Sequence, residues 1–376
     1  MYQRAILHLD MDAFFASVEI KKNSSLAGIP LLVGGSGGRG VVTSCSYEAR
    51  RYGIHAGMPM GLALKRCPDA RTIRGDFESY EQHSAMITEI IAEEGPVFEK
   101  ASIDEFYVDM TGMDRHVGCV KWSGELRQRI IRETGLPISA GLAVNKLVSK
   151  VRAGESKPNG SGWVATGMEK AFLSPLPVRK IPSIGPVTVR KLSLMGVRKA
   201  GTLSQVPVTL LEREFGSMGR EYHRRANGID HRPVVPYSER KSFSSEKTFQ
   251  TDTIDVEFLL RELRNMTSQL AFDLRRAGRL TARVTVKIRY TDFNTYTRGA
   301  RLHYTAHDQQ LLPLAERLFR ELFTRRQCIR LIGVRFDRLA SGYTQLDLFN
   351  NTEQDDRLLL AMDGVRRRFG KGAVTS

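Results

Sequence analysis

The chain has 376 residues, and its 57 Lys and Arg outnumber its 41 Asp and Glu, which gives a formal net charge of +16. This length allows two to four domains with cores of their own, and no apolar run approaches the roughly 18 residues of a membrane helix. The N-terminus carries no secretory pattern, and the scattered cysteines form no CxxC pair (Cys45, Cys67, Cys119 and Cys328). The sequence therefore predicts neither a membrane protein nor a zinc or disulfide scaffold, and a reducing cytoplasm is the expected location.

A charge excess of this size favours a polyanionic partner over the alternative, a basic surface that is only solvated. Part of the excess is local, since residues 241–340 hold 19 Lys and Arg against 11 Asp and Glu. A nucleic acid is the partner that fits this distribution.

The first 50 residues alternate between strand and helix signals. AILHLDMDAFFASVEIKK begins as a strand and changes to a helical period near Ala13, so Asp10 is expected at the end of a strand. PLLVGG is a second strand, and the GGSGGRG that follows lacks the GK[ST] ending of a phosphate-binding loop. VVTSC then resumes as a strand, and SYEARRYGI begins a helix.

The stretch ASIDEFYVDM, residues 101–110, places Asp104 and Glu105 side by side. Strict strand alternation would send them to opposite faces, so we expect them at the hairpin turn between VFEKAS and FYVDM. A solvated hairpin end is one interpretation. A cation site is the other, and it requires a third acid from elsewhere in the chain.

The middle of the chain continues the alternation. We expect helices over residues 80–94, VGCVKWSGELRQRIIRETG and KLVSKVRAGE, a strand at ISAGLAV, and a cap on the last helix from Asn145. The pattern up to about residue 167 predicts one α/β domain, in which residues 20–79 form an insertion.

From Leu173 to Gly228 the pattern predicts short helices and turns. In IPSIGPVTVRKLSLMGV a glycine turn joins two short apolar segments, which is typical of a helix-hairpin-helix that holds a DNA backbone, although a plain helical turn also fits. HRPVVPYSERK, residues 231–241, has no periodicity and is predicted to be a linker.

Beyond the linker, the order strand, helix, strand, strand, helix, strand predicts a ferredoxin-like domain. In its strand ARVTVKIRY, Arg283, Thr285, Lys287 and Arg289 share one face, which predicts a basic ribbon that contacts DNA phosphates. The tail from Ser341 contains TQLDLFNN and an amphipathic DDRLLLAMDGVRRRF. The tail either packs back onto the body or docks its Q-L-x-L-F segment into an apolar groove on a partner.

Asp10 supplies the third acid. Together with Asp104 and Glu105 it could hold two Mg²⁺ ions, which prefer carboxylate and phosphate oxygens and promote in-line phosphoryl displacement. Tyr47 and Arg50, one helical turn apart, can share a face and reach the phosphates of a nucleoside triphosphate. Lys157 in SKPNG adds a point charge.

Five motifs taken together resemble the Y family of translesion DNA polymerases. They are LDMDAFFASVE, SYEARRYGI, SIDEFYVD, NKLVSK with SKPNG, and the IPSIGPVT hairpin. Their order and spacing are similar to the bacterial DNA polymerase IV branch, and the resemblance covers essentially the whole chain. It implies an α/β, multidomain right-hand fold: a palm (1–12 and 80–167), fingers (13–79), a thumb (168–230) and a little finger (242–340), followed by a tail (341–376).

The same resemblance implies roles for individual residues. Asp10, Asp104 and Glu105 would be the catalytic metal ligands, with the Met11 carbonyl completing one metal. Further positions match nucleotide-binding residues (Phe14, Phe15, Tyr47, Arg50 and Lys157), and Phe15 matches the steric gate that excludes a ribose 2′-hydroxyl. Thr43 and Gly57 match positions beside the nascent base pair, and Gly185 a DNA contact of the hairpin.

The resemblance also implies partners: primer–template DNA, dNTP and, through Gln345, Leu346, Leu348 and Phe349, a ring-shaped sliding clamp. It implies a monomer with low fidelity and no proofreading. Two positions depart from the family pattern, because Gly154 stands where an acid is usual and Ser183 where the hairpin has its first glycine.

We therefore interpret the sequence as a template-directed DNA polymerase that adds dNTP to a primer 3′-hydroxyl, with two Mg²⁺ ions, and releases pyrophosphate. Two alternatives remain: a metal-dependent nuclease using the same acids, and a non-catalytic, clamp-recruited DNA-binding protein. A nuclease would not need Phe15 or the triphosphate set, and a scaffold would not need three carboxylates in register.

Overall fold

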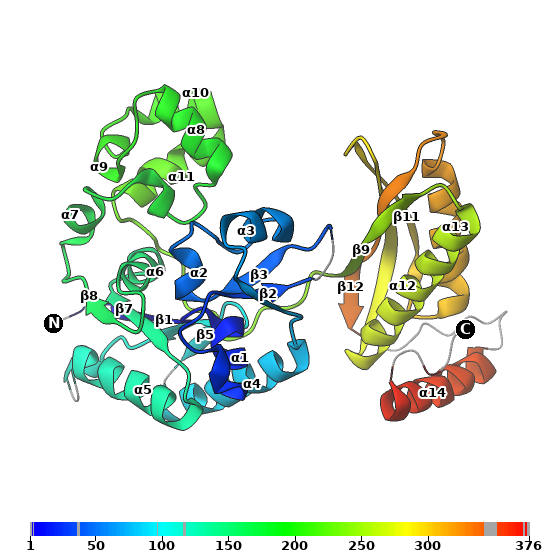
Figure 1. The fold of residues 1–376 in the computed structure, drawn as a ribbon, viewed down its shortest axis with the longest axis horizontal. Coiled ribbons are helices and arrows are strands. Elements are labelled where there is room, and N and C mark those ends of the chain that lie inside the picture. Colours follow the sequence, from blue (N-terminus) through cyan, green and yellow to red (C-terminus); the bar gives the residue numbers. More distant parts are fainter. Residues whose placement is uncertain are drawn as a thin grey trace. The chain divides into compact units, whose positions relative to one another are not determined.

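The structure, a computed structural model, describes residues 4–35, 38–95, 97–115, 118–341 and 352–370, together with Tyr2 and Ala373. The chain forms two compact units, residues 1–238 and 239–376, each of which is drawn in Figure 1. The boundary falls inside the predicted linker 231–241. Over the described ranges, none of the helices has the length and apolar character that crossing a bilayer demands.

A five-stranded sheet with the order β5-β6-β1-β7-β8 forms the centre of the first unit. β7 and β8 are parallel, and the other neighbours are antiparallel. The strands are β1 (Ile6–Met11), β5 (Phe98–Lys100), β6 (Glu105–Asp109), β7 (Ile138–Ala143) and β8 (Ser161–Trp163). β6 begins at Glu105 and Asp104 precedes it, so the two acids do lie where the hairpin turns into its second strand.

The two faces of this sheet have different partners. Leu7, Leu9 and Met11 of β1 are buried in a core completed by α1 (Phe14–Lys22), α4 (Phe77–Glu94) and α5 (Cys119–Thr134). Alternation sends Asp10 to the opposite face, which helix α6 (Lys146–Glu155) covers. The short helices η1 (Ser24–Leu26) and η2 (Met113–Arg115) connect these elements.

Two helix starts illustrate the local signals. α6 is capped as predicted, because the Asn145 side chain accepts a hydrogen bond from the Val148 N–H at 2.9 Å. α4 begins at Phe77, three residues before the predicted start at residue 80, because Asp76 caps it through the Ser79 N–H at 3.2 Å. The earlier start is a small correction to the sequence reading.

Residues 31–73 form a separate small layer with its own buried core. A three-stranded sheet of order β3-β2-β4 carries two short helices: its elements are β2 (Leu31–Gly34), β3 (Val42–Cys45), β4 (Arg71–Ile73), α2 (Tyr47–Arg50) and α3 (Met60–Arg66). This layer lies within residues 20–79, the segment that the sequence predicted to be an insertion.

Residues 169–226 are helical: α7 (Glu169–Leu173), η3 (Val178–Lys180), α8 (Pro186–Leu194), α9 (Ala200–Leu203), α10 (Val208–Phe215) and α11 (Ser217–Ala226). The turn between η3 and α8 carries Ser183 with a φ of 71°. This left-handed conformation suits glycine and is unfavourable for serine. The departure at Ser183 therefore introduces local backbone strain into the hairpin.

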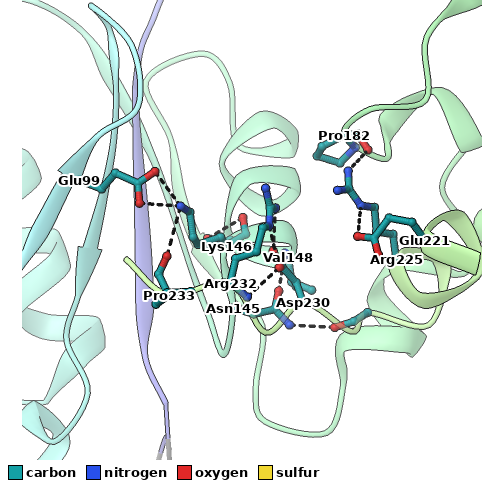
Figure 2. Close-up of polar contacts among 12 residues, drawn as sticks. Glu99, Asn145, Lys146, Val148, Pro182, Glu221, Arg225, Asp230, Arg232 and Pro233 are labelled. Atoms are coloured by element: carbon teal, nitrogen blue, oxygen red, sulfur yellow. Dashed lines mark hydrogen bonds and ion pairs between the residues drawn. The ribbon is translucent and has the colours of Figure 1, made fainter. Parts of the chain in front are cut away.

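Figure 2 shows how the segment that follows α11 is tied to the five-stranded sheet and α6. The Asn145 amide donates to the Gly228 carbonyl at 2.8 Å. The Lys146 ammonium donates to both carboxylate oxygens of Glu99, at 2.7 and 2.6 Å, and to the Pro233 carbonyl at 3.5 Å. Glu99 also accepts the Val235 N–H at 2.8 Å. We call Glu99 and Lys146, with the Pro233 and Val235 backbone groups they bind, the clasp.

An apolar contact lies beside the clasp. Val234 is buried against Ile6 of β1 and Tyr107 of β6, and the Lys146 ammonium lies 4.6 Å from the centre of the Tyr107 ring. Residues 228–235 thus lie on the same face of the sheet as Asp10 and α6.

The second unit has the predicted strand and helix order. Its antiparallel sheet runs β11-β10-β12-β9, and two helices bury one face of it. The elements are β9 (Ser242–Thr253), α12 (Val256–Arg276), β10 (Arg279–Tyr290), β11 (Thr295–Thr305), α13 (Asp308–Leu322) and β12 (Ile329–Ser341).

Helix α14 (Thr352–Phe369) packs against α12 through buried charges. Arg275 donates to Asp363 of α14 at 2.7 and 2.9 Å and to Asp308 at 2.7 Å, and Arg366 lies 3.5 Å from Asp363. The amphipathic part of the tail therefore packs back onto its own unit. The Q-L-x-L-F segment, with Gln345, Leu346, Leu348 and Phe349, lies outside the described residues.

Candidate active site

Two acids lie side by side where β1 ends and β6 begins in the central sheet. Asp10 of β1 is the register partner of Glu105 of β6, so their side chains lie on the same face. Asp104 adjoins them, because its carbonyl accepts the Met11 N–H at 3.0 Å. The Met11 side chain is buried in the core on the other face, so only its backbone could contact a ligand here.

Lysine ammonium groups already compensate two of the three acids. Lys157 lies 2.5 Å from the Asp10 carboxylate, and Lys150 of α6 forms a close ion pair with Glu105. The Asp104 carboxylate instead accepts the Ser102 hydroxyl at 2.6 Å. Asp10, Asp104 and Glu105 are all partly buried.

The two paired acids have pKa values moved in opposite directions. Burial raises the pKa of Asp10, although the nearby Lys157 ammonium opposes this shift. The pKa of Glu105 is lowered to about 2 by His8 and Lys150, despite the opposing effect of burial. The His8 ring lies 3.8 Å from Glu105, and within the described part of the chain neither of its nitrogens has a hydrogen-bond partner.

With these lysine pairs in place, the described residues include no set of three or more acidic, histidine or cysteine side chains that could together hold a metal ion. The expected three-carboxylate cluster is therefore not assembled in this structure. The donor set nevertheless fits a hard divalent cation, because three carboxylates lie on adjoining backbone where β1 ends and β6 begins, and their close polar contacts are with lysine ammonium groups or a hydroxyl.

The expected triphosphate residues lie on two segments. Tyr47 and Arg50 share a face of α2, with the Arg50 guanidinium 4.5 Å from the centre of the Tyr47 ring. The Tyr47 hydroxyl donates to Asp12 at 3.0 Å, and Lys157 also lies 3.8 Å from that carboxylate. The two segments thus meet at Asp12, a residue that the sequence reading did not single out.

Phe15 lies in an aromatic cluster at the start of α1. Its ring stacks on Tyr80 at 4.3 Å between centres and meets the edge of Phe77 at 5.5 Å. It is partly exposed, as a gate would require, whereas the Phe14 side chain is buried in the core. Any nucleotide contact from Phe14 would therefore come from its backbone.

Thr43 and Gly57 are both exposed in the 31–73 layer. Thr43 donates its hydroxyl to the Val33 carbonyl at 2.9 Å, and Gly57 has a φ of 87° with open space where a side chain would begin. Both positions leave room on the surface of this layer.

The expected DNA-binding residues are exposed or partly exposed on their own units. Gly185 lies directly before α8, with Pro186 in its first turn. Arg283, Lys287 and Arg289 project from the open face of β10, as alternation predicted. A recess of about 390 Å³ on this face is lined by Arg283, Thr285, Lys287 and Arg335, among others.

The prediction of a purely basic ribbon is wrong in one respect. Glu246 of β9 lies 2.6 Å from Lys287, and Asp337 of β12 lies 3.5 Å from Arg335. Both acids line the recess. Neighbouring strands supply them, so the sequence of β10 alone could not reveal them.

Two residues of the site were missed by the sequence reading, namely Asp12 and Lys150. Asp12 had a signal, because it is the second acid of LDMD, but it lies beyond the last residue of β1. For Lys150 the sequence offered no signal except its position in KLVSK, one helical turn after Lys146. Its partner Glu105 is 45 residues away, so local spacing could not indicate the pair.

Three sequence profiles of one family match this chain. The impB/mucB/samB family matches residues 9–154, the HHH motif of the same family residues 166–197, and the impB/mucB/samB C-terminal domain residues 240–348. The matches cover the β1–α6 region, the hairpin around Ser183 and the second unit.

Curated relatives match over nearly the full length. A protein named DNA polymerase IV from Dehalococcoides mccartyi is 35% identical over 99% of this chain and 96% of its own length. Another of that name, from Halorhodospira halophila, is 37% identical over 93% of this chain and 99% of its own.

Solved structures of similar fold cover 90% of this chain and 100% of their own, at 28% identity. They include a Y-family DNA polymerase chimera built on Dbh, with a TM-score of 0.82, and an insertion ternary complex of Dbh DNA polymerase, with a TM-score of 0.64.

Proposed function

Because this chain belongs to the Y family of DNA polymerases, the impB/mucB/samB family, it is a DNA-directed DNA polymerase of the translesion type, and we propose that Asp10, Asp104 and Glu105 are its metal ligands. One observation carries this proposal: Asp10 and Glu105 are register partners, and the Asp104 backbone is bonded to the residue after Asp10. Neither the nuclease nor the scaffold alternative is favoured by these relatives.

The metal ions we propose are two Mg²⁺. When bound, they lower the pKa of the primer 3′-hydroxyl and neutralise charge that develops on the phosphates. The chain's part is to present carboxylate oxygens, with the Met11 carbonyl beside them, and to release Lys150 and Lys157 from Glu105 and Asp10. Asp104 is partly exposed and bonded to the Ser102 hydroxyl, so its carboxylate can turn toward this site by rotating its side chain.

The incoming dNTP is the proposed ligand of the α2 face and the 157–160 loop. Arg50 is exposed and can bond phosphate oxygens, and Lys157 can exchange the Asp10 carboxylate for a phosphate. Tyr47 supports Arg50 through its ring. Phe15, stacked on Tyr80, is the proposed steric gate, with Thr43 and Gly57 beside the nascent base pair.

Primer–template DNA is the proposed polyanionic partner. The hairpin at Gly185 offers backbone N–H groups at the start of α8, and the β10 face offers Arg283, Lys287 and Arg289. We further propose that the Q-L-x-L-F segment binds a sliding clamp, that the protein acts as a monomer, and that it works in the cytoplasm, which agrees with four cysteines that are free thiols.

Primer extension tests the metal-site proposal. With a defined template, Mg²⁺ and single dNTPs, the wild type should extend the primer and Asp104→Ala should lose extension by about 10³-fold or more while it binds DNA normally. Asp109→Ala is the matched control, because Asp109 lies at the far end of the strand that Asp104 precedes, and its carboxylate accepts the Thr111 N–H of the following turn. Full activity in Asp104→Ala would refute the ligand role, and primer shortening by the wild type would point to a nuclease.

Sugar selection tests the gate. Phe15→Ala removes the ring that we propose excludes a 2′-hydroxyl, so ribonucleotide insertion should rise by about tenfold or more relative to dNTP insertion. Phe77→Ala, which removes the exposed neighbour of the same cluster, is the control. Unchanged sugar discrimination in Phe15→Ala would refute the gate.

A further inference from the structure

Asp12 is a fully buried carboxylate that joins separate segments of the first unit. It follows β1 directly, and its backbone N–H donates to the Pro137 carbonyl at 3.0 Å. Burying a carboxylate costs folding free energy unless its oxygens are hydrogen-bonded. The hydrogen-bond partners of Asp12 therefore indicate its role.

One carboxylate oxygen of Asp12 accepts the Tyr47 hydroxyl at 3.0 Å. The other accepts the Ser139 hydroxyl at 2.8 Å and the Asn159 backbone N–H at 2.7 Å. Lys157 lies 3.8 Å from the first oxygen. These partners come from α2, β7 and the loop after α6, so a single side chain links the two segments that carry the proposed triphosphate contacts.

The 157–160 loop depends on this anchor. Besides Asp12, the following contacts hold it: the Asn159 backbone and side-chain oxygens accept bonds from Arg127, the Gly160 carbonyl accepts the Ala140 N–H at 2.9 Å, and the Gly160 N–H donates weakly to Ser139 at 3.4 Å. Arg127 and Asp12 thus hold Asn159 from two sides. Loss of the Asp12 acceptor would leave the Asn159 N–H without that bond and would free the loop beside Lys157.

The Tyr47 hydroxyl hydrogen is directed at Asp12 and away from solvent. Burial and the Asp12 charge raise the pKa of Tyr47, so the phenol stays protonated and keeps donating. Tyr47 therefore serves less as a phosphate donor than as a fixed platform, whose ring supports the Arg50 guanidinium at 4.5 Å.

We propose that Asp12 is a positioning residue that sets the spacing between the Arg50 side and the Lys157 side of the dNTP site. It touches neither phosphate nor metal, and it acts through Tyr47 and through the Asn159 backbone. The inference rests on the proposed function, because only a triphosphate bound between these segments makes their spacing matter.

The test is steady-state insertion of a single dNTP by the wild type and by Asp12→Asn. The amide keeps the shape of the carboxylate but presents an N–H to one of its former donors. We expect the KM for dNTP to rise about tenfold or more, kcat to fall less than threefold, and the DNA Kd from fluorescence anisotropy to stay unchanged. A residue that served only stability would lower Tm and leave the KM for dNTP as it was.

Two further variants keep the inference falsifiable. Asp114→Asn is the matched control, because Asp114 is likewise a carboxylate bonded by backbone N–H groups, from Tyr2 at 2.7 Å and Cys119 at 2.9 Å, and the KM for dNTP should not change. If Asp12→Asn fails to fold, the Ser139→Ala variant tests the inference in its place. It removes one hydroxyl from Asp12 and from Gly160, and the KM for dNTP should rise several-fold.

Coupling gives the sharpest readout. Tyr47→Phe should raise the KM for dNTP in the wild type but change it by less than about twofold in Asp12→Ala, because the side chain that the Tyr47 hydroxyl bonds is already absent. An unchanged KM for dNTP in folded Asp12→Asn, or fully additive effects, would overturn the inference. A wild type that does not extend primers would overturn the proposed function instead.

Discussion

Helix α6 carries two lysine–carboxylate pairs on one face, one helical turn apart, and they differ in how completely they are bonded. Lys146 and Glu99 have side chains 8% and 20% exposed, and the pair also binds the Pro233 and Val235 backbone. Lys150 and Glu105 are 33% and 25% exposed, and the ammonium has Glu105 as its close partner. The same residue types therefore form two different ion pairs on α6. The Lys146–Glu99 pair has additional backbone hydrogen bonds, which makes it saturated, and the Lys150–Glu105 pair is unsaturated.

The difference separates a structural pair from a replaceable one. A saturated, desolvated pair resists exchange, because each lost bond leaves a buried charge without compensation. A partly exposed pair with fewer bonds is worth less and can exchange its cation for another. Glu99 therefore suits a clasp that fixes residues 228–235, and Glu105 suits a ligand that must accept a metal ion.

The largest expected effect follows from breaking the clasp. Glu99→Ala leaves the Lys146 charge without its carboxylate, so the first unit should lose about 2–3 kcal/mol of unfolding free energy. Urea unfolding followed by tryptophan fluorescence reports on this unit alone, because Trp122 and Trp163 both belong to it.

The double variant Glu99→Leu with Lys146→Met is the control for the clasp. It removes both charges, so it should recover more than half of the loss. A cost below about 0.5 kcal/mol for Glu99→Ala would show that the two pairs do not differ in kind.

For the replaceable pair, Lys150–Glu105, we expect that removing the lysine strengthens Mg²⁺ binding. Lys150→Met removes a cation that competes for Glu105, so Mg²⁺ should bind the DNA-free protein about two- to fivefold more tightly, which corresponds to 1 kcal/mol or less. Calorimetric titration measures this directly. Lys121→Met, on the exposed face of α5, should leave the affinity unchanged. Weaker Mg²⁺ binding in Lys150→Met would mean that Lys150 orients Glu105 instead of competing for it.

The same variant has a pH signature in the metal-free protein. Glu105 has a folded pKa lowered to about 2 by His8 and Lys150, against an ordinary value of 4.5. Its ionised form therefore stabilises the fold above about pH 4.5, and this contribution disappears as the pH falls toward 2. The stability difference between the wild type and Lys150→Met should be present at pH 7 and vanish near pH 2. A difference that persists at pH 2 would assign the effect to packing.

The sequence predicted the parts of this site that short patterns determine. Strand alternation and the hairpin placed Asp10, Asp104 and Glu105, and helix spacing placed Tyr47 and Arg50 on one face. Residues missed by the sequence reading depend on contacts between distant segments: Asp12 meets Asn159 across 147 positions, and Lys150 meets Glu105 across 45. The acids on the β10 face were missed for the same reason, since β9 and β12 supply them. Local periodicity carries no information about such pairs.

The smallest effect concerns the backbone of α6 itself. Gly154 lies in the last turn, where an added side chain would meet open space. Gly154→Ala should therefore stabilise the first unit by about 0.5 kcal/mol, because alanine loses less backbone entropy in a helix. The variant stiffens the helix without touching either lysine, so Mg²⁺ affinity should stay at the wild-type value. A change in that affinity would show that the exchange at Glu105 depends on the flexibility of α6, and the contrast between the two pairs would then lie partly in the helix that carries them.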